Sequence, residues 1–324
     1  MAHELGLFEQ HGLHVELSRE VGWATIRDKM IYGELDAVHA PAGMVFATTL
    51  GLGSVATDCL TALVLNLHGN AITLSQRLRQ AGVEDGHSLR EYIRRKRERL
   101  TFGVVYHWSS HHVLLRQWLR SFGIDPERDV QIVVVPPSQV FVNLRAGHLD
   151  GYCVGEPWAS LAVMHRSGWI VARTAEIAPL HPEKVLMVRN DFAARSHDEH
   201  LAMVAALIEA CAWCDAPENR ECIVETLARP QYVSAPTEAL RMSMRDIYDF
   251  GYGRVEQCPG FNLFARENAN EPTPGRARWV MDSFFKSGLL PAPDSYPAQL
   301  TEQCFRADLH AKALELTAPI LSAA

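Results

Sequence analysis

The size and composition of the chain are those of a globular protein. It has 324 residues, of which 48% are apolar and 21% charged, and this excludes a disordered or fibrous chain. The formal net charge of −7 argues against a general nucleic-acid binder. No apolar run approaches the ~18 residues that a membrane-spanning helix needs. We therefore expect a sizeable buried core, no direct nucleic-acid partner and no membrane span.

The cysteine pattern and the first residues bear on the compartment. The seven cysteines are odd in number and scattered, which is typical of free thiols in a reducing compartment. The start, Met1-Ala2-His3-Glu4, has neither a basic region nor a long apolar run, so it does not resemble a secretory signal. Both features predict a cytoplasmic protein. The alternative is a periplasmic protein whose signal peptide was lost with a truncated amino terminus.

Apolar periodicity predicts alternating elements in two rounds. In the first round, helices are expected at 2–11, 24–33, 41–53, 73–82 and 89–99, and strands at 14–20, 35–40 and 61–69. In the second round, strands are expected at 100–106, 129–136, 149–155, 169–175 and 184–191, with helices at 111–123, 138–147 and 156–168. From residue 198 onward the pattern is mostly helical.

This alternation predicts an α/β fold of two lobes with parallel sheets covered on both faces. Lobe one is expected over 1–100 and lobe two over 101–188, with 189–324 returning to lobe one and ending in a helical tail. A parallel lobe should open with a strand, whereas this chain opens in a helix, so the first strand of lobe one is expected to be missing. The ligand of such a protein binds in the cleft beyond the carboxyl ends of the strands.

Common catalytic motifs are absent from the sequence. It has no P-loop, no G-x-G-x-x-G after a strand, no G-x-S-x-G and no H-E-x-x-H. Cys211 and Cys214 form a C-x-x-C inside an apolar helix, where two buried thiols are expected rather than a metal or redox site. The basic run 94–97 is read as a solvated helix face, with an acidic partner surface as the alternative. We expect no cofactor and no metal.

Four polar or aromatic residues lie near the ends of predicted strands. Trp23, Asn70 and His111 each follow a strand, and Lys184 begins the strand that returns to lobe one. A serine at 109 or 110 can cap the helix that carries His111, and the free N–H groups of a helix start favour an anion. Each residue taken alone has a structural alternative: a packing aromatic, a turn residue, a solvated histidine and an exposed lysine.

At these residues the sequence resembles a known family. It is similar to the substrate-binding proteins of nitrate/nitrite and bicarbonate ABC transporters, within the wider nitrate/sulfonate/taurine-binding family. The matching stretches are ELGLFEQHGLHVELSREVGWATIRDKMIYGELDAVHA, LNLHGNAITLS, SSHHVLLRQWL, PSQVFVNLRAGHLDGYCVGEPW, HPEKVLMVRNDF and WVMDSFFKSGLLP. The resemblance implies a type II periplasmic-binding-protein fold.

The resemblance also implies a nitrate pocket made of Trp23, Asn70, His111 and Lys184. Relatives often have glutamine where this chain has the shorter Asn70, and a Gly-Gly-Thr-like turn where it has Trp-Ser-Ser. Nitrate has only acceptor oxygens, so a pocket of donors with one ammonium suits it. Bicarbonate carries a hydroxyl that needs an acceptor. The resemblance implies that the pocket of the bicarbonate-binding relatives has an acidic residue near the lysine position and a bound metal. Lys184 therefore favours nitrate or nitrite.

Within the family, the signal-free start and the cysteines resemble the cytoplasmic nitrate/nitrite sensors. Such a sensor implies a partner, an ANTAR-type RNA-binding antiterminator that is released when the anion binds, and control of nitrate assimilation genes. The alternative is the substrate-binding component of a nitrate/bicarbonate transporter. A second alternative is an enzyme like the pyrimidine synthases of the same fold, which use a cysteine-rich cluster, a lysine-bound pyridoxal phosphate and iron. The sequence has no such cluster, so we expect no catalysis.

Overall fold

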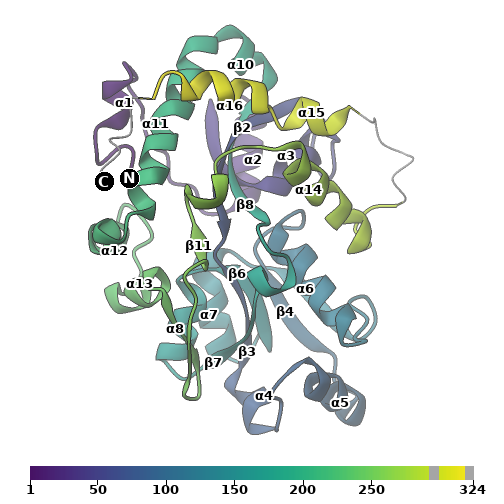
Figure 1. Cartoon of the computed structure of the whole chain (residues 1–324). Coiled ribbons are helices and arrows are strands. Elements are labelled where there is room, and N and C mark those ends of the chain that lie inside the picture. The colour runs from purple at the N-terminus through teal and green to yellow at the C-terminus, as the bar shows by residue number, and fades with distance from the viewer. Residues whose placement is uncertain (292–298, 318–324) are drawn as a thin grey trace.

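The computed structural model describes residues 1–291 and 299–317 and consists of two lobes, each built around one β-sheet. Figure 1 shows the two lobes one above the other, joined by long strands that run between them. Within the described ranges, no helix combines the length and the apolar character needed to cross a membrane. All seven cysteines are free, and Cys211 is buried as expected while Cys214 is half-buried.

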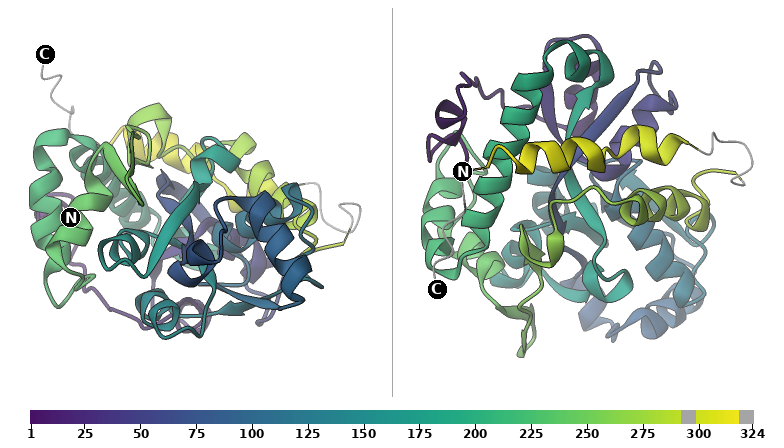
Figure 2. Two further views of the ribbon diagram at one scale, coloured as in Figure 1. Left: turned by 90° about the horizontal axis from the view of Figure 1, so that it is seen from below. Right: turned by 45° about the horizontal axis from the view of Figure 1, so that its top comes forward.

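The first sheet has the order β1-β8-β2-β11 among the described residues. Its strands are β1 (Ala37–Pro41), β8 (Pro182–Arg189), β2 (Cys59–His68) and β11 (Asn262–Leu263). Helices α3 (Ala42–Thr49), α11 (His197–Asp215) and α16 (Ala307–Leu314) pack on it, and α16 packs across α11 (Figure 2). Leu60, Leu63 and Val188 from the sheet meet Val204 and Leu309 from the helices in one buried cluster.

The second sheet has the order β5-β4-β6-β3-β7 among the described residues. Its strands are β5 (Val130–Val134), β4 (Leu100–Val104), β6 (Gly151–Gly155), β3 (Asn70–Ser75) and β7 (Gly168–Arg173). Helices α6 (Ser110–Ser121), α7 (Pro137–Arg145) and α8 (Trp158–Met164) contact its strands. The start of α6 lies against the first sheet, because Ser110 and His111 contact Glu183 of β8.

The remaining helices connect or cover the sheets. They are α1 (Leu7–Gln10), α2 (Trp23–Ile31), α4 (Gln76–Gln80), α5 (Gly86–Lys96), α9 (Thr174–Ile177), α10 (Asn190–Arg195), α12 (Arg220–Ala228), α13 (Thr237–Met244), α14 (Pro274–Lys286) and α15 (Leu300–Cys304). A hairpin of β9 (Ile247–Gly251) and β10 (Arg254–Gln257) packs against β7 and α8.

The chain passes between the sheets where β2 ends at His68 and β3 begins at Asn70. It passes again between β7 and β8, and once more between the hairpin and β11. The division into 1–100, 101–188 and 189–324 stays a prediction about domains. The sheet membership shows that β3 already belongs to the second sheet.

The expectation of parallel sheets is wrong for most strand pairs. Among the strands of the described residues, the parallel ladders are those of β4 with β5 and β6, whereas β1, β2, β3 and β8 form antiparallel ladders. A helix that returns to the same sheet imposes a parallel neighbour. Strands β3 and β8 instead enter from the other lobe, so this constraint does not apply to them.

Three local predictions also differ from the structure. Residues 14–20 form no strand, and no backbone ladder bond to this segment occurs within the described chain. The helix expected at 73–82 is shorter, because 70–75 form β3 and only 76–80 form α4. The tail beyond residue 198 is not purely helical, because it contains the β9/β10 hairpin and β11.

Candidate functional site

The four residues proposed from the sequence come from four elements of both lobes. Trp23 opens α2, Asn70 opens β3, His111 lies in the first turn of α6 and Lys184 lies on β8. Asn70 and His111 are each 1% exposed. The Nε2 atom of His111 lies 2.9 Å from the Oδ1 atom of Asn70. The structure therefore brings the two residues of lobe two into direct contact in the interlobe region.

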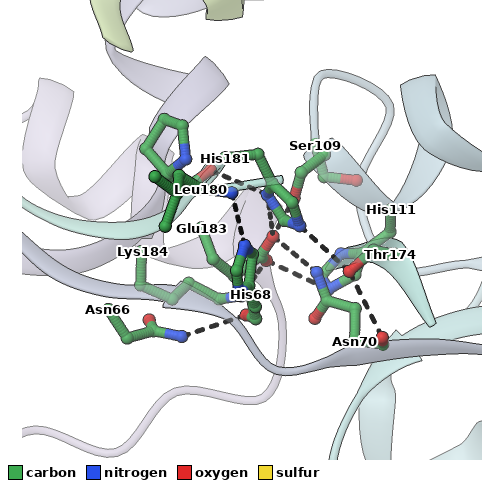
Figure 3. Close-up of polar contacts among 12 residues, drawn as sticks. Asn66, His68, Asn70, Ser109, His111, Thr174, Leu180, His181, Glu183 and Lys184 are labelled. Carbon is green, nitrogen blue, oxygen red and sulfur yellow. Dashed lines mark hydrogen bonds and ion pairs between the residues drawn. The ribbon is translucent and has the colours of Figure 1, made fainter. Parts of the chain in front are cut away.

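Glu183, which is not among the residues expected from the sequence, joins these residues (Figure 3). The Asn70 amide donates to Glu183 Oε2 at 2.5 Å, and the Ser110 hydroxyl donates to the same oxygen. The His111 Nε2 atom is 3.1 Å from Glu183 Oε1, and the Lys184 ammonium donates to that oxygen. This carboxylate of β8 therefore bridges the two lobes.

A slip in the strand register explains how Glu183 and Lys184 meet. Successive residues of a strand normally point to opposite faces. Here Asn66 of β2 lies opposite Lys184, but the next residue, Leu67, lies opposite Pro182. Glu183 is thus the extra residue of a β-bulge, which re-aims side chains in this way. The bulge places a carboxylate and an ammonium from adjacent positions in one site.

Lys184 also contacts the fourth residue, Trp23. The ammonium lies 5.6 Å from the centroid of the Trp23 ring, a cation–π distance. The ring of His39 on β1 meets the Trp23 ring edge-on at 5.7 Å. The indole Nε1 of Trp23 is buried without a hydrogen-bond partner in the described part of the chain. Because an indole N–H can only donate, this atom offers a free donor to an acceptor in the site.

Burial and neighbouring charges set the protonation of the cluster. Burial alone would raise the pKa of Glu183, but Lys184 and the two imidazoles of His111 and His181 hold that pKa well below its usual value. Burial lowers the pKa of His111 to about 3 against the opposing effect of Glu183. At neutral pH the site thus contains an ionised carboxylate, an ammonium and neutral imidazoles. The His111 Nε2 then carries the proton, because both atoms that it faces are acceptors.

The start of α6 adds a further preference for negative charge. Ser109 is the N-cap, and its hydroxyl accepts from the backbone N–H of His112 at 3.3 Å. The free N–H groups and the dipole of a helix start favour anions. Ser110 and His111 lie in this first turn and both contact Glu183. In the structure the Glu183 carboxylate is the negative charge that lies at this helix start.

The sequence contained a partial signal for the missed residues. Glu183 lies beside Lys184 in the His-Pro-Glu-Lys stretch, and Ser110 beside His111, but neither neighbour was assigned to the site. The bulge that unites the first pair is not visible in the sequence pattern. Within the described ranges, no group of three or more histidine, cysteine, aspartate or glutamate side chains has the arrangement of a metal site. The cluster can donate hydrogen bonds to a negatively charged group. In the structure that group is the Glu183 carboxylate, which is paired with Lys184.

Comparison with known proteins finds one matching family and relatives that are transport proteins. Residues 1–228 match the NMT1-like family. The nitrate import ATP-binding protein NrtC of Synechocystis sp. is 37% identical over 97% of this chain and 47% of its own length. The bicarbonate transport ATP-binding protein CmpC of Synechococcus elongatus is 35% identical over 94% of this chain and 45% of its own length. The chain thus spans about half the length of these curated relatives.

Smaller relatives match over more of their length. The nitrate/nitrite binding protein NrtA of Synechococcus elongatus is 30% identical over 95% of this chain and 72% of its own. The crystal structure of the periplasmic nitrate-binding protein NrtA from Synechocystis PCC 6803 superposes with a TM-score of 0.92 at 26% identity, covering 97% of this chain and 84% of that chain. Both lobes of the fold are therefore those of a type II periplasmic binding protein.

Proposed function

The chain belongs to the NMT1-like family, and from this premise we propose that it binds nitrate or nitrite in the interlobe site as the substrate-binding component of an ABC transporter. The observation that carries this proposal is the convergence of Trp23, Asn70, His111 and Lys184 from both lobes on one buried position. The similarity to NrtC, a nitrate import protein, and to NrtA, a nitrate/nitrite binding protein, supports it.

The side chains suit a small planar oxyanion. Trp23 has a free buried N–H, His111 donates through Nε2, and Lys184 supplies the neutralising charge. An anion that enters displaces the Glu183 carboxylate from these donors. Binding then closes the lobes around the ligand, the usual motion of two-lobed proteins. No covalent step is needed, so we propose binding without catalysis.

The role in transport accounts for the relatives better than a sensor role does. NrtA from Synechocystis is described as periplasmic, which supports a periplasmic location for this chain. The cytoplasmic sensor with an ANTAR-type partner stays a prediction from the sequence. A pull-down of such an antiterminator with and without nitrate tests it, and equal recovery under both conditions rejects it.

Bicarbonate is a second candidate, and Glu183 is the observation that favours it. Bicarbonate carries one hydroxyl, which needs an acceptor, while its other oxygens need donors. A buried ionised carboxylate next to Lys184 provides that acceptor. CmpC, a bicarbonate transport protein, is 35% identical to this chain, close to the 37% of NrtC.

Parallel titrations of the full chain separate the two candidates. Nitrate, nitrite and bicarbonate are each titrated at pH 8 and constant ionic strength, with chloride as the control, and the unfolding temperature is followed. A ligand that binds the folded state raises that temperature with concentration. The nitrate proposal requires a larger shift with nitrate or nitrite than with chloride. A shift with bicarbonate alone replaces it by the second candidate, and no shift with any anion rejects both.

A further inference from the structure

The charges of the interlobe site balance in the structure, and an anion that enters the site changes this balance. Glu183 is 1% exposed and carries a negative charge that the Lys184 ammonium neutralises. Nitrate or nitrite adds a second negative charge to this buried region without adding a positive one. Because an unpaired buried charge is unfavourable, a titratable group nearby tends to change its protonation instead. The smallest positive charge that solvent can supply is a proton.

Lys184 is the one cation among the titratable groups that face the Glu183 carboxylate in the described chain. These groups come from each element around it and are Lys184 on β8, His181 just before β8, His39 on β1, His68 on β2, His111 on α6 and Cys153 on β6. Burial is the main cause that lowers the pKa of the four imidazoles and raises the pKa of the thiol. At pH 7 these five groups are therefore neutral, and each imidazole can still accept a proton.

Both ring nitrogens of His181 face hydrogen-bond acceptors. The Nε2 atom lies 2.9 Å from the hydroxyl oxygen of Thr174 (Figure 3). That hydroxyl donates to the carbonyl of Asn70 at 3.2 Å, so its oxygen is left to accept from Nε2. The Nδ1 atom lies 3.3 Å from the Pro182 carbonyl oxygen and 3.9 Å from Glu183 Oε2. A neutral ring has one N–H, whereas these surroundings offer acceptors to two.

The aromatic neighbours of His181 also favour a second proton on its ring. The ring of Trp279 on α14 stacks on the imidazole, with 5.3 Å between the centroids and 23° between the planes. The negative face of an indole attracts a cation. The ring of His68, 5.3 Å from that of His181, is neutral and adds no opposing charge at pH 7. Burial opposes the second proton, and a further negative charge beside Glu183 offsets this opposition.

We propose that binding of the anion is coupled to the uptake of one proton, which His181 holds between Pro182 and Glu183. The entering anion takes the donors of Lys184 and His111, and the displaced carboxylate turns its Oε2 toward Nδ1 of His181. The proton comes from solvent, and the N–H at Nδ1 is the only bond that forms. The region then contains two positive and two negative charges. This inference rests on the proposed function and makes pH a regulator of the same site.

The coupling gives the affinity a defined dependence on pH. Because the proton binds more tightly in the complex than in the free protein, the pKa of His181 is higher in the complex. The affinity for nitrate therefore rises as the pH falls, from the pKa in the complex down to the pKa of about 4 in the free protein. For one coupled proton the limit is about tenfold per pH unit.

A pH-stat experiment on the full chain counts the proton directly. Sodium nitrate is added to the protein at pH 6 in potassium chloride, and the acid needed to hold the pH is compared with the amount of bound anion from calorimetry. Uptake should approach one proton per nitrate, and calorimetry at constant ionic strength should give a higher affinity at pH 6 than at pH 8. Binding without proton uptake, or with equal affinity at both pH values, overturns this proposal alone. No nitrate binding at either pH rejects the proposed function and this proposal with it.

Two variants test where the proton is held. His181→Gln removes the imidazole, and Glu183→Gln leaves Lys184 and nitrate to balance each other, so each should bind nitrate without proton uptake. His200→Gln on α11 is the matched control, because burial also lowers the pKa of this histidine to about 4, and it should take up the proton as the wild type does. Uptake that persists in either folded variant overturns the proposal. If circular dichroism shows that His181→Gln does not fold, Glu183→Gln decides.

Discussion

The imidazole Nε2 of His68 accepts a hydrogen bond from the backbone N–H of Leu180 at 2.6 Å. The Nδ1 atom of the same ring donates to the carbonyl of Gly260 at 2.9 Å. His68 ends β2 at the first passage between the sheets, Leu180 lies in the second and Gly260 in the third. One neutral imidazole ring therefore forms hydrogen bonds within all three segments that connect the lobes. Any motion of one lobe against the other takes place about these segments.

Replacing His68 by asparagine should loosen this hinge. Asparagine tolerates the positive φ of 62° at this position, but it is too short to reach both partners. The buried polar groups left unpaired should cost about 1–3 kcal/mol in the free energy of unfolding. Denaturant titration measures this cost. His148→Asn, at an exposed histidine, is the control, and an equal effect of both variants would argue against the hinge contact.

Lys184→Gln should weaken nitrate binding about tenfold or more while leaving the fold intact. The variant removes the positive charge of the site, and hydrogen bonds to charged groups are worth about 1.5–3 kcal/mol. Calorimetric titration gives the affinity, and circular dichroism checks the fold. Lys312→Gln, an exposed lysine of α16, serves as the matched control. Normal nitrate titration of a folded Lys184→Gln protein would place the ligand elsewhere.

Glu183→Gln should change nitrate and bicarbonate binding in opposite directions. Without the carboxylate, Lys184 and Ser110 are free to bind an anion, so nitrate affinity should rise, by about tenfold if one charged hydrogen bond is released. Bicarbonate loses the acceptor for its hydroxyl and should bind more weakly. The ratio of the two dissociation constants is the measurement. A parallel change for both anions would mean that Glu183 does not face the ligand.

The stability of the protein should fall as the pH is lowered from about 6.5 to 5. Burial lowers the pKa of His111 to about 3, and of His112 and His181 to about 4. In this window the unfolded chain takes up protons that the folded chain does not. Each histidine therefore lowers the free energy of unfolding by about 1.4 kcal/mol for each unit by which the pH falls. Thermal unfolding at pH 7, 6 and 5 measures the trend.

The buried residue Glu156 opposes this loss of stability at low pH, and a variant at this position provides the control. Burial raises the pKa of Glu156 to about 7, so the folded state holds a proton there that the unfolded state releases above about 4.5. Its contribution to stability therefore grows as the pH falls, opposite to that of the histidines. Glu156→Gln removes this offset and should make the loss of stability toward pH 5 steeper. An unchanged slope would show that Glu156 is ionised in the folded protein.

The candidate site could be proposed from the sequence because its residues lie near the ends of predicted strands. Trp23, Asn70 and His111 follow predicted strands, and the family resemblance selected them with Lys184. Glu183 could not be found in the same way, since the period of two in a strand assigns it and Lys184 to opposite faces. The register slip opposite Asn66 and Leu67 depends on the pairing of two distant strands. Such a slip leaves no mark on the local sequence.

The fold was predictable at the level of two α/β lobes, but the strand directions were not. Residues 73–75 of β3 were expected to begin a helix, and 70–72 were assigned to no element. All six residues of β3 are buried, so the strand shows no alternation of buried and exposed positions. The segment 14–20 does alternate, yet it forms no strand, because a strand also needs a partner within reach. The β9/β10 hairpin turns through Gly251 and Gly253, both at positive φ, inside a stretch that was expected to be helical.

In the proposed anion site, the contact between Glu183 and the start of α6 makes the protein its own competitor. A tethered carboxylate is present at an effective concentration in the millimolar range or above, without any anion in solution. Each incoming anion must displace this internal carboxylate. Its apparent affinity is therefore the intrinsic affinity multiplied by the fraction of time for which the carboxylate leaves the site free. Weakly coordinating ions such as chloride lose this exchange. The carboxylate is 1% exposed, so this competition comes from a buried side chain, and it lowers the apparent affinity of every anion by the same factor.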